Sequence, residues 1–386
     1  MDSPIIWAEI DLKAIAHNVR ELRRIIAPEA RLMAVVKANA YGHGIIEVAD
    51  QALQHGAEAL GVARASEGIQ IRKAGLDAPV LVFSYTPPDM AKKLVEFDLT
   101  QTVYSYRNAE ALSVAAGTTG KKIKVHIKVD TGMGRLGLLP DRFRSLAPDH
   151  GVDGSAVSEV EAIAGLQHLE LKGIFTHFAA ADITDRSYAE YQFEMFMDFL
   201  SRLNLAGVEI PVKHAANSAA IINMPETHLD MVRAGISIYG LFTSDEVDKS
   251  RVELKPAMEL KAKIISLKRV PAGFKVSYGA TYETKKSTTI ATVPVGYADG
   301  YNRLLSSRGH MLVCGRRAPV VGRVCMDMTV LDVGDIPEVS PGDEVIIFGK
   351  QGDELITVDE IASTLKTINY EIVSTITDRV PRIYLR

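Results

Sequence analysis

Cysteine is scarce in this chain: only Cys314 and Cys325 occur among its 386 residues. Their spacing fits neither a disulfide framework nor a zinc site, so we expect a reducing compartment and no bound metal. Long apolar runs are also missing, and no segment approaches the roughly 18 residues of a transmembrane helix. The N-terminal segment lacks the positive region and unbroken apolar stretch of a secretory signal. These absences predict a cytoplasmic protein without membrane association.

A strong charge of one sign is absent as well. The chain has 44 basic and 48 acidic residues, which gives a net charge of -4. Because the basic and acidic residues are nearly balanced, the charge gives no reason to expect binding to nucleic acid or to an anionic membrane surface. The remaining composition, with 47% hydrophobic and 24% charged residues, is typical of a globular protein. The length predicts two domains.

Short apolar or β-branched segments alternate with segments of helical periodicity over the first part of the chain. The strand candidates are residues 31–38, 59–63, 79–84, 100–105, 124–130, 171–177, 211–216 and 231–234. Such alternation indicates an α/β protein with a parallel sheet. Eight units in roughly 240 residues match the usual size of a (β/α)8 TIM-type barrel. A doubly wound open sheet is the competing topology, which the pattern alone does not exclude.

Near residue 240 the pattern changes to alternation of period two. In AMELKAKI, residues 257–264, apolar and polar side chains would face opposite sides of a strand. We therefore expect a barrel domain at residues 1–242, whose first ten or so residues can pack with the second domain. Residues 243–386 are expected to form a mostly antiparallel β domain. One helix is predicted near its end, where Thr357 and Glu360 have capping-box spacing.

Lys37 ends the first predicted strand, and functional groups of such barrels lie where strands end. For an arbitrary lysine, simple solvation is the better explanation. Here, apolar residues precede Lys37 and small ones follow it, in AVVKANAYGHG. A lysine that is partly removed from water has a lowered pKa and can attack an aldehyde, as in Schiff-base chemistry. Composition alone does not decide between these interpretations.

The later strand ends carry further polar groups. Asn217 and Ser218 follow the seventh strand, and Arg233 and Gly235 follow or end the eighth. Barrels often bind phosphate with these two loops, through backbone N–H groups. Each piece alone is more readily explained as an ordinary loop. Their joint position favours a phosphate site.

Two other features allow more than one interpretation. DTGMGRLG, residues 130–137, contains G-x-G-x-x-G, but it follows the fifth strand and so is weak as a dinucleotide motif. Its Arg135 suggests a planar cation for a substrate carboxylate. His177, at the end of the sixth strand, fits a buried structural histidine and a site residue equally well. Cys325 has no partner histidine nearby in the sequence and is better explained as an ordinary thiol.

Several motifs together resemble those of one enzyme family. They are AVVKANAYGHG, KVDTGMGRLG, FTHFA, HAANSAA, MVRAGISIYG, VSYGATY, GYADGY and RVCMDMT. In these segments the chain resembles alanine racemase, a fold-type III enzyme that uses pyridoxal 5'-phosphate. The resemblance extends through both predicted domains. It implies the interconversion of L-alanine and D-alanine, which supplies D-alanine for peptidoglycan.

The resemblance also implies roles for individual residues. Lys37 would bind pyridoxal phosphate covalently, and Arg233 would face the pyridine nitrogen. The cofactor phosphate would be held by Tyr41, Ser218, Gly235, Ile236 and Tyr370. Lys37 and Tyr278 would be the two bases, and His177 would link Tyr278 to Arg233.

The remaining implied roles concern the substrate and the partner subunit. Arg135 and the backbone N–H of Met326 would hold the substrate carboxylate. Lys128 matches a lysine that is carbamylated in some family members. The family forms a head-to-tail homodimer in which Tyr278 and Met326 act in the partner's site.

Three alternatives stay open on the sequence. One is a racemase of another small amino acid, such as serine. A fold-type III decarboxylase is less well supported, because such enzymes face the pyridine nitrogen with a carboxylate, and MVRAGISIYG supplies an arginine. A non-catalytic pyridoxal phosphate carrier resembles the barrel alone, so it leaves the β domain unexplained.

Overall fold

Eight parallel strands form the larger sheet, as the sequence pattern predicts. The computed structural model describes residues 4–144 and 154–386. In the part of the chain that it describes, this sheet contains β2 (Arg31–Val35), β3 (Ala59–Val62), β4 (Val80–Val82), β5 (Leu99–Val103), β6 (Ile123–Lys128), β7 (Leu169–Phe175), β8 (Val212–His214) and β9 (Met231–Ala234). Each strand corresponds to one of the eight predicted segments.

The order of these strands shows a barrel. Neighbours pair in the order β8-β7-β6-β5-β4-β3-β2-β9, and every pair is parallel. The two ends of this path meet through backbone hydrogen bonds from Asp230 N to Lys213 O, at 3.1 Å, and from Arg233 N to Ala216 O, at 3.0 Å. The doubly wound alternative is therefore excluded.

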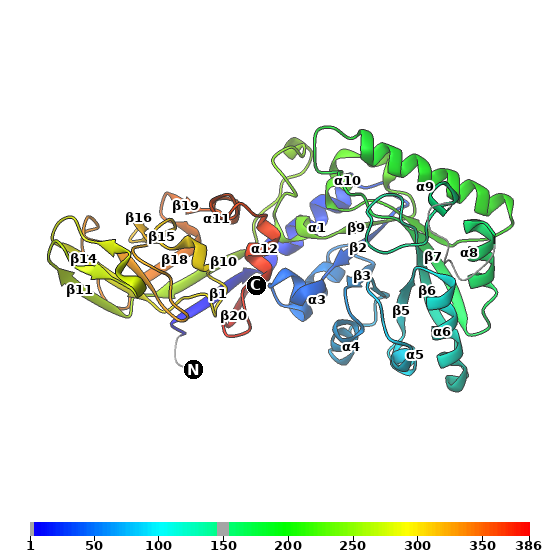
Figure 1. Ribbon diagram of the computed structural model, residues 1–386, viewed down its shortest axis with the longest axis horizontal. Coiled ribbons are helices and arrows are strands. Elements are labelled where there is room, and N and C mark those ends of the chain that lie inside the picture. Colours follow the sequence, from blue (N-terminus) through cyan, green and yellow to red (C-terminus); the bar gives the residue numbers. More distant parts are fainter. Residues whose placement is uncertain (1–3, 145–153) are drawn as a thin grey trace. The chain divides into compact units, whose positions relative to one another are not determined.

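Helices cover the outside of the barrel (Figure 1). They are α3 (Ile45–Gln54), α4 (Ala65–Lys73), α5 (Ala91–Glu96), α6 (Tyr106–Ala116), α7 (Asp141–Arg144), α8 (Ala156–Ala164), α9 (Ser187–Leu205) and α10 (Ser218–Asn223), preceded by α1 (Leu12–Ile25). Inside, the strands pack a cluster of Met33, Ala59, Leu81, Phe175, Val212 and Met231. The short apolar strands thus bury side chains both in the barrel and against the helices.

By its internal contacts the chain divides into two compact units. We call Ala14–Ala40 with Ile45–Lys255 the barrel unit. The β unit contains the residues up to Lys13, then Tyr41–Gly44, and Pro256–Arg386. The lysine-bearing segment of the first strand end therefore contributes to both units.

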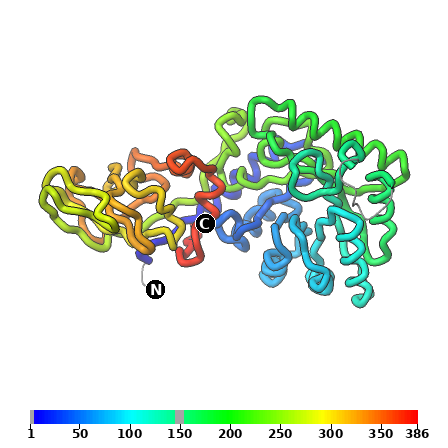
Figure 2. The backbone as a smooth tube through the Cα atoms, in the orientation of Figure 1, coloured from blue at the N-terminus to red at the C-terminus, as the bar shows by residue number. Residues whose placement is uncertain are grey.

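The β unit is mostly antiparallel. Its strands are β1 (Ile6–Asp11), β10 (Met258–Lys263), β11 (Ser266–Val270), β12 (Lys275–Val276), β13 (Tyr282–Glu283), β14 (Thr288–Val293), β15 (His310–Val313), β16 (Arg316–Pro319), β17 (Thr329–Asp332), β18 (Glu344–Gln351), β19 (Glu354–Ile356) and β20 (Arg382–Leu385). Strand β1 lies between β10 and β20, so the two ends of the chain share one sheet (Figure 2). In β10, buried and partly exposed residues alternate, which confirms the predicted period of two.

Two helices, rather than the single one predicted, lie near the C-terminus. Helix α11 (Val358–Leu365) begins at the expected cap, where Thr357 accepts a hydrogen bond from Glu360 N at 3.0 Å. Helix α12 (Asn369–Ser374) follows at once and was not predicted, because six residues are too few to show helical periodicity. Among the described residues, no helix has the length and apolar character needed to span a bilayer.

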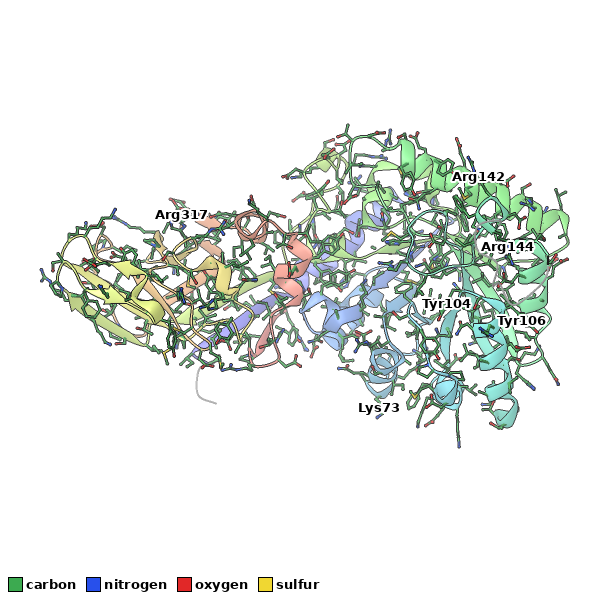
Figure 3. All side chains as sticks on the ribbon, viewed as in Figure 1. Lys73, Tyr104, Tyr106, Arg142, Arg144 and Arg317 are labelled. Carbon is green, nitrogen blue, oxygen red and sulfur yellow. The ribbon has the colours of Figure 1, made fainter. Side chains whose placement is uncertain are left out.

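One buried ion pair stabilises the outer layer of the barrel unit. Arg144 and Glu159 pair at 2.7 Å, with side chains that are 7% and 3% exposed. Glu159 also accepts a hydrogen bond from Tyr106 N at 2.8 Å, and so connects the starts of α6 and α8 to α7 (Figure 3). In the β unit, Arg317 bridges Glu354 and Glu360 at the surface.

Candidate active site

The backbone turns left-handed immediately after Lys37. Residues 38–41 have φ between 51° and 53°, although none of them is glycine. Such a conformation costs about 1–2 kcal/mol per residue, so it needs outside support. Glu67 supplies part of it by accepting a hydrogen bond from Ala38 N at 2.6 Å, and the Asn39 side chain accepts from Ile45 N at 2.9 Å. The turn places Lys37 at the C-terminal end of β2, where the sequence predicts a functional lysine.

Glycines allow the next part of this segment to pack closely. Gly42 has a φ of 86°, and a Cβ atom there would lie 2.2 Å from Val373 O in α12. A Cβ atom on Gly44, whose φ is 102°, would lie 1.9 Å from the Tyr384 hydroxyl. Arg382 donates to Gly42 O at 3.0 Å. These close approaches explain why glycines follow the tyrosine in AYGHG.

The two tyrosines expected to hold a phosphate lie together in the β unit. The rings of Tyr41 and Tyr370 have centroids 6.0 Å apart and an interplanar angle of 49°. Tyr41 is buried, and burial raises the pKa of its hydroxyl above the ordinary value. The Tyr41 phenol is therefore a neutral hydrogen-bonding group at neutral pH.

Cationic side chains gather at the C-terminal end of the barrel. Burial, and then the charge of Arg135, lower the pKa of Lys37, which Glu67 partly opposes. Lys128 is buried, and burial followed by the charges of Arg135, Arg233 and Lys37 lowers its pKa to about 8. Four such cations within reach of one another attract anions, and they favour the neutral form of the lysines.

Arg233 is the most enclosed of these cations. Its Nη1 donates to His214 Nδ1 at 2.9 Å, and its Nη2 donates to the carbonyl oxygens of Thr176 and Ala215 at 2.8 Å each. The same Nη2 lies 3.3 Å from His177 Nδ1. Burial lowers the Arg233 pKa to about 9, so the group remains a cation at neutral pH. Its Nε–H and its second Nη1–H have no acceptor among the residues that the structure describes, so the Nε–H is available to a ligand.

His177 is neutral in this setting. Burial is the main cause of its lowered pKa, and Arg233, Arg135, Lys128 and Lys37 act in the same direction. The guanidinium can only donate, so its contact with His177 Nδ1, which shares the two Nη2 protons with two backbone carbonyls, leaves the proton of a neutral His177 on Nε2. The ring can therefore accept from the arginine on one side and donate on the other.

A serine joins the loops after β8 and β9. Ser218 Oγ accepts from Gly235 N at 2.9 Å and from the Ser237 hydroxyl at 3.0 Å. Ser218 begins α10, whose N-cap Asn217 accepts from Ala220 N at 3.0 Å. Ile236 starts the short 3-10 helix Ile236–Tyr239 directly after Gly235. The structure thus brings Ser218, Gly235 and Ile236 together, as a phosphate site requires.

The glycine-rich loop is organised around a carboxylate of the chain itself. Asp130 accepts from the backbone N–H groups of Gly132, Gly134 and Arg135 at 3.0, 3.0 and 3.1 Å. A Cβ atom on Gly137 would lie 2.4 Å from Asp130 N. N–H groups already bonded to Asp130 are not available for a pyrophosphate, so this is no dinucleotide motif. The loop instead presents the Arg135 side chain, which is exposed.

Tyr278 and Met326 lie on adjoining loops of the β unit. Ser277, with φ of 64°, donates to Arg323 O at 2.6 Å and lies 3.5 Å from Cys325 Sγ. Tyr278 begins the short 3-10 helix Tyr278–Ala280. In the single chain the Tyr278 side chain is 70% exposed and Met326 is 53% exposed. The two loops therefore expose both residues in the single chain.

Sequence reasoning missed two buried histidines in the barrel. His126 lies on β6 and His214 on β8, and Nδ1 of the first is 2.9 Å from Nε2 of the second. The His214 ring stacks on Phe175, with centroids 4.7 Å apart. The available signal was a histidine among apolar residues in KVHIK and a second one in PVKHAA.

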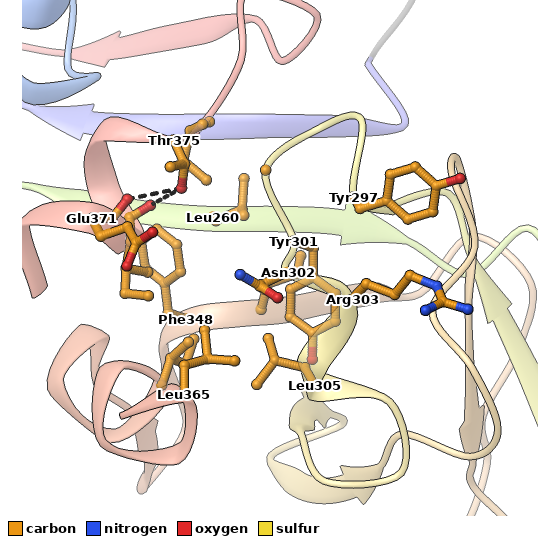
Figure 4. Close-up of a pocket in the computed structure, with 15 residues that line it drawn as sticks. Leu260, Tyr297, Tyr301, Asn302, Arg303, Leu305, Phe348, Leu365, Glu371 and Thr375 are labelled. Atoms are coloured by element: carbon orange, nitrogen blue, oxygen red, sulfur yellow. Dashed lines mark hydrogen bonds between the residues drawn. The ribbon is translucent and has the colours of Figure 1, made fainter. Parts of the chain in front are cut away.

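A separate cavity of about 410 Å³ lies within the β unit. Its walls are mainly apolar and include Leu260, Phe348 and Leu365 (Figure 4). Tyr301 lines it, and the buried Tyr301 hydroxyl has no hydrogen-bond partner among the described residues. Arg303 and Glu371 are the charged residues among those that line it.

Comparison with known proteins identifies the family. The model described as "Alanine racemase, N-terminal domain" matches residues 10–243, and "Alanine racemase, C-terminal domain" matches residues 257–384. Alanine racemase of Desulfosudis oleivorans is 55% identical, over 98% of this chain and 96% of that protein. Alanine racemase of Methanococcus maripaludis is 50% identical over the full length of both.

Solved structures agree with this assignment. The alanine racemase of Bacillus anthracis with bound L-Ala-P has a TM-score of 0.92 at 38% identity, and covers 100% of this chain and 96% of that one. A histidine racemase from Leuconostoc mesenteroides has a TM-score of 0.88 at 28% identity, with 100% and 99% covered. Both family models match, and relatives at 50–55% identity are alanine racemases along nearly their whole length. The chain therefore belongs to the alanine racemase family and is an amino-acid racemase that interconverts L-alanine and D-alanine.

Proposed function

We propose that the racemase uses pyridoxal 5'-phosphate held at the C-terminal end of the barrel. The residues present fit this group. A lysine of lowered pKa, a serine between two phosphate-binding loops and the spare Nε–H of Arg233 match its aldehyde, phosphate and ring nitrogen. Lys37 would hold it covalently, with Tyr41, Ser218, Gly235, Ile236 and Tyr370 at the phosphate. When bound, the cofactor withdraws electrons from the substrate Cα and so makes its proton removable.

Arg233 makes the site suited to racemisation. A guanidinium only donates hydrogen bonds and keeps its proton, so it would leave the ring nitrogen unprotonated. A less electron-withdrawing ring limits side reactions of the deprotonated substrate. The hydrogen bonds to His214, Thr176 and Ala215 fix this guanidinium in place. A carboxylate at this position would favour the decarboxylase alternative instead.

Two bases are needed, because the proton leaves one face of Cα and returns to the other. We infer that Lys37 serves one face, since burial and the charge of Arg135 favour its neutral amine. Tyr278 would serve the other. His177 would connect Tyr278 to Arg233 through its two ring nitrogens, and Arg135 and Met326 N–H would hold the substrate carboxylate.

The observation that supports a site shared between two chains is the exposure of Tyr278, the proposed second base. Tyr278 is 70% exposed in one chain, although its proposed task requires contact with a substrate on the barrel. We infer that a second copy of the chain covers Tyr278 and Met326 with its own barrel site. The active form would then be a homodimer with two shared sites.

Subunit mixing tests this inference. Lys37→Ala and Tyr278→Phe should each be nearly inactive alone. After subunit exchange, half of the dimers carry both variants, and one of the two sites in each is intact. The mixture should therefore regain about a quarter of wild-type activity.

A matched control uses two substitutions in the same unit. Lys37→Ala mixed with Arg233→Ala leaves every barrel site damaged, so this mixture should stay inactive. Failure of the first pair to regain activity, with exchange confirmed by mass spectrometry, would contradict a shared site.

Substrate and reaction can be checked in the same preparation. Incubation with L-alanine in deuterated water should give D-alanine that carries deuterium at Cα. Serine in parallel reports the substrate range. Release of CO2, or exchange without inversion, would favour a decarboxylase or a non-catalytic carrier.

A further inference from the structure

A second cavity opens at the N-terminal end of the barrel, where the strands begin. Its volume is about 380 Å³. Apolar side chains form its floor: Met33, Leu81, Val212 and Met231. Charged residues surround its rim: Arg31, Lys124, Lys172, Glu58, Asp77 and Asp98. His126 lines the cavity as well, although it is a β6 residue and only 7% exposed.

A chain of hydrogen bonds determines the protonation of His126. The guanidinium of Arg233 can only donate, so His214 Nδ1 is an acceptor and carries no proton. The neutral His214 ring then has its proton on Nε2, which donates to His126 Nδ1 at 2.9 Å. His126 in turn must carry its proton on Nε2. The arginine thus specifies both histidine tautomers.

This Nε2–H is a donor without a protein partner. Within the described chain, the only hydrogen bond of the His126 side chain is the one to His214. A buried donor usually has an acceptor, and the residue borders the cavity. The cavity therefore offers a hydrogen-bond donor to whatever occupies it.

The charge near His126 selects the kind of acceptor. The charged groups that act on its ring, Arg31 and Arg233, are both cations, and after burial they help to keep it neutral. Other rim cations are already paired: Lys124 with Asp98 at 2.7 Å and Lys172 with Glu170 at 2.5 Å. Among the described residues Arg31 has no ion pair, and neither have the rim carboxylates Glu58 and Asp77, but these two are not among the charges that act on the His126 ring. An anionic acceptor is therefore favoured between Arg31 and His126.

We propose that this cavity binds a small monocarboxylate with an apolar body. The carboxylate accepts a hydrogen bond from His126 Nε2–H and faces Arg31, and the apolar body lies on the floor formed by Met33, Leu81, Val212 and Met231. The volume suits a molecule of about ten to fifteen heavy atoms. This site lies at the other end of the strands from Lys37, and the proposal does not depend on the proposed function.

The test uses full-length protein labelled with ¹⁵N at histidine. Titration with 3-phenylpropionate should shift the His126 Nε2 signal in a saturable way and should stabilise the protein to heat. The amide 3-phenylpropionamide and the amine 3-phenylpropylamine have similar bodies without the anion. Each should bind at least tenfold more weakly.

Three variants test whether 3-phenylpropionate binds in this cavity. His126→Asn keeps an acceptor for His214 and removes the donor to the cavity, so saturable binding of 3-phenylpropionate should be lost. Arg31→Gln, at an exposed rim position, should weaken it about tenfold. Lys172→Gln removes a cation that is already paired, and should change the affinity less than about twofold.

Four results would overturn the proposal. A His126 Nε2 without a proton in the free protein would remove its chemical basis. If the amide binds as tightly as 3-phenylpropionate, the carboxylate is not what the cavity recognises. If a folded His126→Asn variant binds 3-phenylpropionate as tightly as the wild type, the ligand binds elsewhere. No saturable shift with 3-phenylpropionate at millimolar concentration would also refute it.

Discussion

Acidification should destabilise the barrel through its buried histidines. Burial, with Arg31 and Arg233, lowers the His126 pKa from 6.5 to about 3. The folded-state pKa is depressed, so the neutral ring contributes stability above pH 6.5. That stability is lost as the pH falls toward 3, because the unfolded chain binds the proton first. The His214 pKa is lowered too, by burial and by Arg233, so it acts in the same direction.

The size of the effect follows from the two His126 pKa values. With 6.5 in the unfolded chain and about 3 in the folded one, the loss of unfolding free energy is about 1.4 kcal/mol at pH 5.5 and about 2.7 kcal/mol at pH 4.5. The larger value is a sizeable fraction of the marginal stability of a domain, about 5–15 kcal/mol. Because the side chain is buried, solvent screening does not reduce them much.

Urea unfolding, followed by circular dichroism from pH 7.5 to 4.5, measures this dependence. His126→Asn keeps an acceptor for His214 but does not titrate, so its stability should fall with a slope smaller by about one proton below pH 6. The comparison between the two proteins cancels the contributions of titrating groups that do not contact His126. Equal slopes for wild type and variant would refute the assignment of a neutral, buried His126.

Three further predictions concern other parts of the chain. Tyr301→Phe removes a buried hydroxyl without a partner and should raise the unfolding free energy by about 1 kcal/mol, whereas a loss would show that the hydroxyl has a bound acceptor. Glu159→Ala removes a buried carboxylate that pairs with Arg144 and accepts from Tyr106 N, and should lower the unfolding free energy by about 3–5 kcal/mol in urea titration, a loss that an exposed pair would not give. Lys128, with a pKa of about 8, should have about a quarter of its amine neutral at pH 7.5, against about a thousandth for a free lysine. Carbon-13 NMR with labelled bicarbonate should therefore show a carbamate that increases from pH 7 to 9 and is absent in Lys128→Ala; a signal that remains in the variant would assign the carbamate elsewhere.

The sequence predicts the barrel well because the signal is local. Each strand is a short run of apolar residues between helical segments, and eight such runs match a barrel, although only the strand order excludes the doubly wound sheet. Period-two alternation in β10 likewise identified the antiparallel unit. The place of Lys37 at the end of the first barrel strand follows from the same pattern, whereas its catalytic role stays a prediction.

Features that depend on distant residues could not be predicted. Nothing in Ala-Asn-Ala-Tyr indicates a left-handed turn, which requires Glu67, about thirty residues away, to accept from Ala38 N. The pairing of His126 with His214 joins strands that are 88 residues apart in sequence. The close approach of Gly42 to Val373 spans most of the chain. Such contacts are decided by packing, so a local pattern does not show them.

The division of the chain also limits how the protein can be taken apart. Residues 41–44 belong to the β unit, while Lys37 and Ile45 belong to the barrel unit, so the backbone passes between the units four times. All four residues are buried. A fragment ending at residue 255 would lose Val373, Arg382 and Tyr384, against which this segment packs. The two units are therefore not interchangeable modules: recombination between relatives has to exchange residues 41–44 together with α12 and β20.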